Sequence, residues 1–457
     1  MSVSIIKNTD SYKWSHFLFY PEGTQYVESY LESRGGKYPA TVFFGLQFIV
    51  DDYLSKPITM ADILEAEAFA KKHGVPFNKE GWLHILTEHE GYLPLIIKAV
   101  PEGTLVTTKN VLCTVRNTDP KCAWLTSYVE TLLLRIWYTC TVATRIFYMK
   151  QKMKPYFDAT SDSGNMDFAL LDFSARGCSS YESNQLGGAA YLMLFMGSDS
   201  VAAVDFVNTH YGEDMVGFSV PATEHSIMCA YGHENEFESF KRILEQAPEG
   251  GIVSVVSDTW NIYEACTMWT ELADLVRKRN LTLVVRPDSG EMKDVLPRVL
   301  DILDEGFGST VNSKGYGVLD NVKVLWGDGI NEDTCTDPFA IAETMGISAD
   351  SIIVGSGGGL MQSNIDRDTC KFAFKASAVC INGEWKGIAK DPITDPGKQS
   401  KQGLLDLLYD EDLDYYFTID RLTESYPQST AFGIYYEDGQ TTFQDWADIK
   451  ERVNSYL

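Results

Sequence analysis

The second half of the chain repeats one arrangement, in which a short apolar run ends in polar residues. Asp258 follows the run in GIVSVVSDTW, Arg286 and Asp288 follow that in LTLVVRPDSG, and Asp328 follows that in NVKVLWGDGI. These carboxylates could hold sugar hydroxyls or a metal ion. Mg²⁺ is usually bound through one or two carboxylates together with phosphate oxygens of the substrate. The residue types therefore favour a site for a phosphorylated, hydroxyl-rich ligand.

A fourth run, SIIVGSGGGL, ends in three consecutive glycines, Gly357, Gly358 and Gly359. Each glycine costs roughly 0.5–1 kcal/mol in backbone freedom relative to alanine, so we expect a sharp turn or a close approach to a ligand. The N–H groups of such a loop, with a helix start behind it, can bind a phosphate. The loop matches neither the GxGxxG dinucleotide pattern nor the GxxxxGK[ST] phosphate loop.

Basic residues follow the glycines in a chain that is otherwise acidic. They are Arg367, Lys375, Lys390, Lys398 and Lys401. Solvated surface lysines would explain the segment alone, but beside a phosphate-binding loop a polyphosphate ligand is the better interpretation.

The elements that must position these residues are successive βα units. The four runs lie about 28 to 40 residues apart, and helical patterns cover 262–278, 292–305 and 337–345 between them. Continuous Val, Ile and Leu runs predict parallel strands covered on both faces. Together with the earlier runs MDFALLDFSARG and MVGFSVPATEHS they predict an α/β fold with an irregular (β/α) barrel. Its active site is expected at the carboxyl ends of the strands.

The rest of the chain predicts a second, mostly antiparallel sheet-rich domain. Residues 92–116 contain short strands with Pro-Glu-Gly and Lys-Asn turns, and residues 371–390 form a strand pair around Asn382-Gly383. A long helical stretch, 123–156, would connect the two domains. We expect the barrel domain to comprise 1–36 and 137–370, and the sheet-rich domain 37–136 and 371–457.

Composition excludes several classes of protein. The net charge is −26 over 457 residues, which argues against a broad nucleic-acid-binding face. The nine cysteines are scattered without a CxxC pair, so we expect neither a disulfide framework nor a zinc site, and a cytoplasmic location. We see no signal peptide, and no apolar run approaches the roughly 20 residues of a membrane helix.

Nine segments, in order, resemble the nicotinamide phosphoribosyltransferases, a family of type II phosphoribosyltransferases. They are TDSYKWSH, DFSARGCSS, GSDSVA, SVPATEHS, SVVSDTWNIY, VVRPDSG, GDGI, GSGGGLMQ and KDPITDPGKQSKQG. The resemblance spans residues 8 to 450. It implies transfer of a phosphoribosyl group from 5-phosphoribosyl pyrophosphate to nicotinamide in NAD salvage. It also implies a homodimer with active sites at the subunit interface.

The resemblance assigns the base site to four residues. Phe173 and Tyr12 would sandwich the nicotinamide ring, with Tyr12 coming from the partner subunit. Asp199 would accept a hydrogen bond from the carboxamide, and Arg176 would lie beside the ring and the ribose phosphate.

The resemblance also assigns the phosphoribosyl pyrophosphate site. Gly357 and Gly358 would bind the 5-phosphate, joined by Arg367 and Lys375. The other implied substrate contacts are Arg34, Ser254, Asp258, Arg286, Asp288, Gly327, Asp328, Lys390 and Lys398, with Arg286 and Asp288 counted as catalytic. Asp258 and Asp288 would hold Mg²⁺ through its waters.

His225 resembles the family histidine that is phosphorylated, so it is also counted as catalytic, and ATP is expected as an optional coupling substrate. Leu404 stands after Gly403 where the family pattern leads us to expect an arginine.

Three alternative functions are considered, and particular residues argue against each of them. A nicotinate phosphoribosyltransferase would bind a carboxylate, which Asp199 would repel. A barrel aldolase or isomerase would need a lysine or a general base at a strand end, and no predicted strand end carries a lysine. A non-catalytic protein of the same fold would tolerate loss of Arg286 or Asp288, yet both are present.

Overall fold

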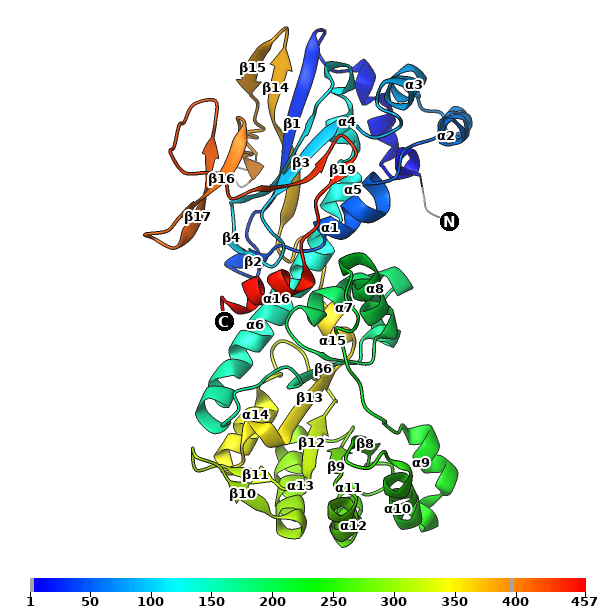
Figure 1. The fold of residues 1–457 in the computed structure, drawn as a ribbon, viewed down its shortest axis with the longest axis vertical. Helices are drawn as coiled ribbons and strands as arrows, with labels where there is room; N and C mark the ends of the chain where they lie inside the picture. The colour runs from blue at the N-terminus through cyan, green and yellow to red at the C-terminus, as the bar shows by residue number, and fades with distance from the viewer. Residues whose placement is uncertain (1–3, 395–397) are drawn as a thin grey trace. The chain divides into compact units, whose positions relative to one another are not determined.

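The computed structural model describes residues 4–394 and 398–457, and the chain divides into two compact units (Figure 1). Unit 1 comprises Met1–Thr144, His210–Gly212 and Ile365–Tyr456, and unit 2 comprises Arg145–Thr209, Glu213–Asn364 and Leu457. This division differs from the expected one at the N-terminus. Residues 1–36 group with the sheet-rich unit because β1 (Thr24–Ser33) pairs with β14 (Phe372–Ile381) and β5 (Val111–Asn117).

Unit 2 is built on a six-stranded sheet in the order β7-β6-β13-β12-β9-β8, and every pairing in it is parallel. The strands are β6 (Leu170–Asp172), β7 (Gly197–Ser198), β8 (Ile252–Val256), β9 (Thr282–Arg286), β12 (Val322–Trp326) and β13 (Ile352–Ser356). The four apolar runs and the DFALLDF segment thus form strands as predicted.

The segment from Phe218 to Ala222 closes this sheet into a ring. Single parallel bridges join Gly197 to Phe218 and Ala222 to Ser254, which are the two sheet edges. Pro221 lies inside the segment and has no N–H to donate, so a regular ladder cannot form there. The ring follows the order of the sequence, and the expected irregular barrel is confirmed.

The helices of unit 2 alternate with the strands. They include α7 (Tyr181–Leu192), α8 (Val201–Tyr211), α9 (His225–Tyr231), α10 (Glu236–Gln246), α11 (Ile262–Glu271), α12 (Ala273–Lys278), α13 (Met292–Phe307), α14 (Asp337–Thr344) and α15 (Gly358–Met361). In α13, Val295, Val299 and Leu303 are buried at four-residue spacing, which is the amphipathic pattern that places one face on a core. A small hairpin, β10 (Ser309–Val311) and β11 (Gly317–Leu319), follows α13. The predicted helix over 262–278 is divided at Leu272 into α11 and α12.

Unit 1 contains a seven-stranded antiparallel sheet in the order β15-β14-β1-β5-β3-β18-β19. The strands not yet named are β3 (Leu95–Ala99), β15 (Glu384–Gly387), β18 (Gly433–Glu437) and β19 (Gln440–Thr441). Two further pairs are β2 (Ala40–Val42) with β4 (Leu105–Thr107), and β16 (Leu405–Asp410) with β17 (Tyr415–Asp420). Asn382 and Gly383 have φ of 52° and 83°, as the tight turn between β14 and β15 requires. The sheet-rich domain drawn from both flanks is therefore confirmed.

The helices of unit 1 are mostly short. They are α1 (Leu46–Ile49), α2 (Met60–His73), α3 (Lys79–Glu88), α4 (Leu125–Tyr128), α5 (Glu130–Leu134) and α16 (Trp446–Asn454), and α6 (Trp137–Thr160) spans the boundary between the units in the sequence. The continuous helix expected over 123–156 is broken before α6. There Ile136 N and Tyr138 N donate to carbonyls three residues back, so the chain passes through a tighter turn.

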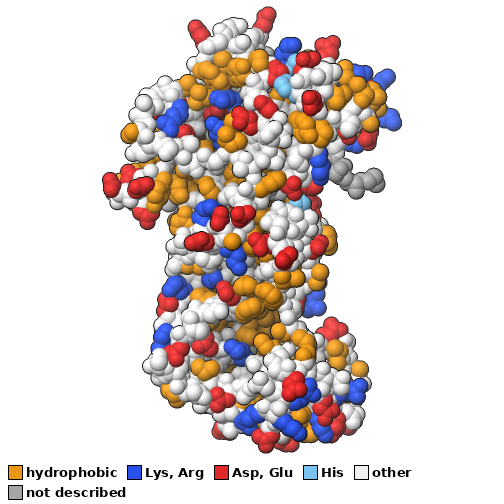
Figure 2. All heavy atoms as spheres, in the orientation of Figure 1, with side chains coloured by type: hydrophobic (Ala, Val, Ile, Leu, Met, Phe, Trp, Pro, Cys, Tyr) orange, Lys and Arg blue, Asp and Glu red, His pale blue; other side chains and the backbone are white. Residues whose placement is uncertain are grey.

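The surface and the thiols agree with the composition. Acidic side chains are scattered over the visible face rather than gathered in one patch (Figure 2). All nine cysteines are free thiols, and seven of them are buried. Within 4–394 and 398–457, no helix is both long and apolar enough to cross a bilayer.

Candidate active site

Two adjoining cavities lie in unit 2 at the barrel. The polar cavity has a volume of about 700 Å³, and the apolar cavity has a volume of about 350 Å³ and extends among Leu171, Val284 and Ile353 of the strands. Four residues line both cavities: Phe173, Asp199, Ala222 and Arg286. A ligand that spans the two cavities must therefore pass an aromatic ring, a carboxylate and a guanidinium.

The glycine in β13 and the glycines that follow the strand have different roles in the packing. A Cβ on Gly355 would lie 2.2 Å from Phe173 Cε2, so this glycine makes room for the aromatic ring. Gly357 and Gly358 are different, because the nearest atoms to an added Cβ there lie 3.5 Å and 3.8 Å away and both residues line the polar cavity. A side chain at these two positions would thus meet only ordinary van der Waals contacts, so packing alone does not require the two glycines predicted to bind phosphate.

Arg145, which the sequence did not single out, holds this loop in place. Its side chain is buried and donates to the carbonyl oxygens of Gly359 (2.9 Å), Ser363 (2.8 Å) and Asn364 (3.0 Å). Hydrogen bonds from a charged donor are stronger than neutral ones. Arg145 therefore fixes the backbone that directly follows Gly357 and Gly358, the two glycines that line the polar cavity.

The RPD segment after β9 forms a compact ion pair at the cavity. Arg286 Nη2 donates to Asp288 Oδ1 at 2.9 Å, and the guanidinium carbon lies 5.4 Å from the centre of the Phe173 ring. An added Cβ at Gly327 would lie 3.2 Å from that Asp288 oxygen, so glycine allows β12 to end beside the pair. Arg286 Nε is buried without a hydrogen-bond partner among the described residues, which leaves a donor for a ligand.

His225 and Asp258 meet at the same end of the barrel. His225 begins α9, and its Nε2 lies 3.0 Å from Asp258 Oδ1. Asp258 is nearly buried and also accepts hydrogen bonds from Asp288 N and Ser289 Oγ, whereas the His225 side chain is 47% exposed. If Nε2 carries the proton toward Asp258, then Nδ1 bears the lone pair and can act as a nucleophile.

Asp199 is presented to the cavities by the ends of β6 and β7. Its N–H donates to the carbonyl oxygen of Asp172, and its Oδ1 accepts from Ser219 Oγ at 2.6 Å. Asp172 itself is fully buried and accepts from Ser174 N and Ser198 Oγ. Asp172 and Ser219 were missed by the sequence reasoning, although Asp172 directly precedes Phe173 at a predicted strand end.

The structure brings most of the predicted site residues of unit 2 to one place. The polar cavity is lined by Phe173, Arg176, Asp199, His225, Arg286, Asp288, Gly327, Asp328, Gly357 and Gly358. Asp258 contacts this set through His225 and Asp288, while Ser254 on β8 lines the apolar cavity. Among the charged residues that line the polar cavity, the arginines are Arg176 and Arg286, and the carboxylates are Asp199, Glu224, Asp288 and Asp328.

The predicted basic residues of unit 1 form their own group. Burial lowers the pKa of the Lys375 ammonium, and the positive charges of Arg34, Lys390 and Lys13 lower it further, although Glu130 opposes them. Arg34 Nε donates to Glu32 at 2.8 Å, and the backbone of Lys390 is held by Ser400. Such a concentration of cations favours an anionic ligand.

The remaining predicted residues lie at the surface of unit 1. Tyr12, in the 3₁₀ helix Ser11–Leu18, is 59% exposed, and its ring meets His16 edge-on. Arg367 pairs weakly with its neighbour Asp368, and Lys398 is exposed. Residues 395–397 of the KDPITDPGKQSKQG segment lie outside the described residues.

Comparison with known proteins agrees with this geometry. Residues 168–428 match the nicotinate phosphoribosyltransferase (NAPRTase) family, and residues 4–97 match the nicotinamide phosphoribosyltransferase N-terminal domain. The chain is 47% identical over 412 residues to a nicotinamide phosphoribosyltransferase of Xanthomonas campestris pv. campestris (strain 8004), covering 89% of this chain and 88% of the relative. It is 32% identical to one of Acinetobacter baylyi (strain ATCC 33305 / BD413 / ADP1), covering 98% and 96%.

A solved structure shares the fold. The nicotinate-nucleotide pyrophosphorylase from Pyrococcus furiosus superposes with a TM-score of 0.65 at 15% identity, covering 99% of this chain and 95% of that one. The barrel and its strand-end cavity define a protein of the phosphoribosyltransferase class. More narrowly, the chain belongs to the nicotinate phosphoribosyltransferase family and carries the N-terminal domain of the nicotinamide phosphoribosyltransferases.

Proposed function

We propose that this chain is a nicotinamide phosphoribosyltransferase, which makes nicotinamide mononucleotide and pyrophosphate from nicotinamide and 5-phosphoribosyl pyrophosphate in NAD salvage. The observation that carries the proposal is the junction of the two cavities, where Phe173, Asp199 and Arg286 line both. The names of the two bacterial relatives support it.

The junction suits a flat aromatic amide. Phe173 offers an apolar wall, and Asp199 offers an acceptor that Ser219 orients. A carboxamide NH₂ can donate to Asp199, whereas the carboxylate of nicotinate would place two negative charges together. The amide is therefore the better substrate.

The polar cavity suits the phosphoribosyl group. Gly357 and Gly358 would offer N–H groups to the 5-phosphate, and Arg286 and Asp288 would hold the ribose and the leaving pyrophosphate. Two arginines face four carboxylates in this cavity, so its own charges cannot balance a pyrophosphate. Arg34, Lys390 and Lys398 are proposed to face the pyrophosphate across the subunit interface, and Arg367 and Lys375 are proposed to bind the 5-phosphate.

Mg²⁺ is proposed as the cofactor, because Asp258 and Asp288 lie together at one end of the barrel and carry carboxylate oxygens, which are the ligands that this ion prefers. Bound there, it would neutralise charge on the pyrophosphate. The chain itself positions the reactants: pyrophosphate leaves, an oxocarbenium-like ribose forms, and the pyridine nitrogen attacks. Catalysis of this kind depends on orientation and on electrostatic stabilisation of the leaving group.

ATP is proposed as a coupling substrate that phosphorylates His225. The imidazole is exposed and oriented by Asp258, which supports the assignment. Incubation with γ-labelled ATP should give acid-labile label on the protein, and His225→Ala should abolish it while some ATP-independent synthesis remains. Label that persists in the variant would exclude His225.

A homodimer with shared active sites is proposed as the assembly, and the exposed Tyr12 supports it, because an aromatic ring left in water is available to a partner. A cytoplasmic location is proposed because the nine cysteines are free thiols, which fits a reducing compartment.

The proposed function is tested by the products. Purified protein, nicotinamide, 5-phosphoribosyl pyrophosphate and Mg²⁺ should give nicotinamide mononucleotide and an equal amount of pyrophosphate, measured by mass spectrometry and a coupled pyrophosphate assay. Asp288→Asn should lose most of this activity. Absence of mononucleotide from the folded parent protein would refute the proposal.

A further inference from the structure

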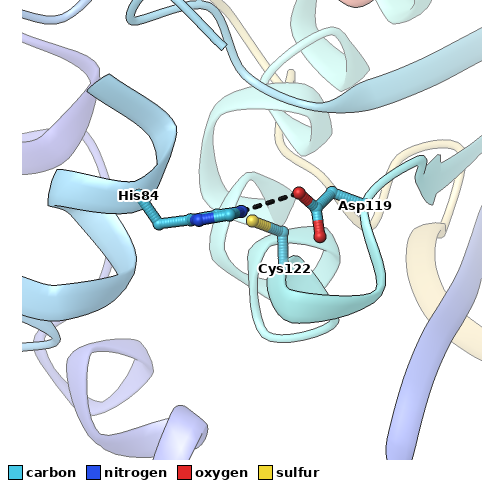
Figure 3. A group of neighbouring side chains, drawn as sticks. All are labelled: His84, Asp119 and Cys122. Atoms are coloured by element: carbon cyan, nitrogen blue, oxygen red, sulfur yellow. Dashed lines mark hydrogen bonds and ion pairs between the residues drawn. The ribbon is translucent and has the colours of Figure 1, made fainter. Parts of the chain in front are cut away.

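Four side chains that can bind a metal meet in unit 1, outside the residues assigned so far. His84 lies in α3 and His89 caps its end, while Asp119 caps the start of the 3₁₀ turn Pro120–Cys122 that follows β5 and Cys122 is the last residue of that turn. Both histidines donate from Nε2 to Asp119 Oδ2, each at 2.7 Å. The ligand atoms of His84, Asp119 and Cys122 all lie within 4.8 Å of one another, and the Cys122 sulfur points toward the other two (Figure 3).

We propose that His84, His89, Asp119 and Cys122 form a structural Zn²⁺ site. Imidazole, carboxylate and thiolate are the ligands that zinc takes in proteins, and a closed set of four protein ligands is typical of structural sites. The spacing fits as well. His84-x₄-His89 falls within the H-x₃₋₅-H pattern, and Asp119-x₂-Cys122 has the spacing of a CxxC pair with aspartate at the first position.

The two histidine–carboxylate contacts need only a small opening to accept the ion, whereas the His89 ring must also move toward the group formed by His84, Asp119 and Cys122, which lies within 4.8 Å without it. Two ligands at zinc-to-nitrogen or zinc-to-oxygen distances of about 2.0–2.1 Å around a tetrahedral centre lie about 3.3 Å apart. The present nitrogen-to-oxygen distances are 2.7 Å, so each contact must open by about half an ångström. Side-chain rotation of the histidines at the end of α3 can supply this movement.

The surroundings already hold the carboxylate in the required direction. Asp119 Oδ1 accepts from Lys121 N at 2.7 Å, which leaves Oδ2 directed at the histidines. Asn117 Nδ2 donates to the Asp119 carbonyl oxygen at 2.8 Å and so fixes the backbone. Outer hydrogen bonds of this kind orient metal ligands.

The four side chains are largely buried, as in a structural metal site, yet they are accessible enough for an ion to enter. The side chains of His84 and Asp119 are 18% and 15% exposed, and Cys122 is fully buried. A bound ion would join the end of α3 to the segment after β5, which are 30 residues and more apart in the sequence. The expected effect is therefore on the stability of unit 1 rather than on the transfer reaction.

Cobalt is the direct probe, because Co²⁺ replaces Zn²⁺ and reports its ligands by absorption. Untagged full-length protein is freed of metal by chelator dialysis and titrated with Co²⁺. We expect one equivalent to give the strong visible bands of a tetrahedral centre and a thiolate-to-cobalt charge-transfer band, both displaced by Zn²⁺. Carboxylates elsewhere can bind Co²⁺ but cannot produce the thiolate band.

Variants identify the ligands. His84→Gln and Cys122→Ser should weaken Zn²⁺ binding at least about a hundredfold, because loss of an outer-shell partner alone costs roughly 10- to 100-fold. His73→Gln and Cys229→Ser, which alter an exposed histidine of unit 1 and an exposed cysteine, should leave it unchanged. Zn²⁺ should also raise the melting temperature of the parent and of both controls.

The proposal is wrong if the folded parent protein shows no thiolate band with Co²⁺, since that result does not depend on any variant. It is equally wrong if His84→Gln, shown to be folded by circular dichroism, binds Zn²⁺ as tightly as the parent. In either case the four residues form only a hydrogen-bonded His–Asp–His cluster beside a buried thiol.

Discussion

Among single residues, Asp199 has the clearest consequence for substrate choice. Its carboxylate lies where the apolar and polar cavities meet, and Ser219 holds one of its oxygens, so the other is available to a ligand. An acceptor in that position favours an amide and disfavours a carboxylate.

We therefore predict that Asp199→Asn lowers kcat/KM for nicotinamide roughly 10- to 150-fold, which corresponds to one charged hydrogen bond of about 1.5–3 kcal/mol. The ratio of nicotinamide to nicotinate use should narrow at the same time, because the repulsion is also removed. Steady-state kinetics with each base measures both effects. Asp205→Asn, an exposed aspartate on α8, is the matched control and should behave as the parent. If the variant uses nicotinamide and nicotinate in the same ratio as the parent, Asp199 does not select the base.

Among the helices and strands, α6 supplies the side chain that holds the backbone after β13. Arg145 on α6 binds three carbonyl oxygens of residues 359–364. A lysine has one ammonium group in place of a planar guanidinium and cannot reproduce these contacts.

Arg145→Lys should raise KM for 5-phosphoribosyl pyrophosphate about tenfold, the effect of losing about 1.4 kcal/mol of loop positioning, and should change KM for nicotinamide much less. Lys154→Arg on the same helix, where the side chain only pairs with Asp158, is the control. Initial rates at varied concentration of each substrate give both constants. Equal changes in the two constants would mean that Arg145 supports the fold as a whole.

Strand β1 contains a carboxyl group whose titration affects stability. Burial raises the pKa of Glu28 to about 7, although Arg116 on β5 and the N–H of Leu405 oppose the rise. Because the folded-state pKa is above the usual 4.5, the stabilising contribution is present below about pH 4.5 and is lost as pH rises through 7.

Glu28→Gln keeps the shape and the acceptor for Leu405 N but cannot ionise. It should match the parent near pH 5 and be more stable at pH 8, by at most about 3 kcal/mol for a shift of this size. Urea denaturation at the two pH values tests this, with the exposed Glu384→Gln as control. If the variant and the parent differ in free energy of unfolding by the same amount at both pH values, ionisation of buried Glu28 is not the cause of the difference.

Sequence patterns predicted the strands well because buried parallel strands are continuous apolar runs, as in β8, β9, β12 and β13. They placed the run MVGFSVPATEHS in the barrel but not its irregularity, since Pro221 permits only isolated bridges at Phe218–Ala222, and they missed the breaks before α6. They also placed residues 1–36 with the barrel, because the pairing of β1 with β14 is set by contacts between residues about 340 or more positions apart.

The candidate site was predictable to the extent that its residues follow strands directly. Phe173, Asp288 and Asp328 are examples, since parallel strands bring their carboxyl ends together. Arg145 and the His84 cluster were not predictable, because a helix-borne arginine and ligands from separate segments have no local signature. The distinct roles of Gly355 and Gly357 likewise required coordinates.

For the whole molecule, we predict that each active site uses residues of two subunits. Tyr12→Ala and Asp288→Ala should each be inactive alone. In a mixed dimer one site carries both lesions and the other carries neither, so co-expression should restore activity. With random pairing about half the dimers are mixed, and about a quarter of all sites should work.

For this assay the two variant chains carry different affinity tags. Purification by one tag and then by the other isolates the mixed dimer. The matched control mixes Tyr12→Ala with parent chains, where activity is expected in any case. Mixed dimers that form without any recovery would show that Tyr12 serves its own chain or no site.

The preference for nicotinamide is measured most directly in a single reaction that contains nicotinamide and nicotinate at equal concentration, with 5-phosphoribosyl pyrophosphate and Mg²⁺. Mass spectrometry of the two mononucleotides gives the ratio of the two kcat/KM values. The account predicts that nicotinamide mononucleotide predominates by at least tenfold, since Asp199 accepts from the amide and repels the acid. Equal amounts of the two products, or an excess of nicotinate mononucleotide, would contradict it.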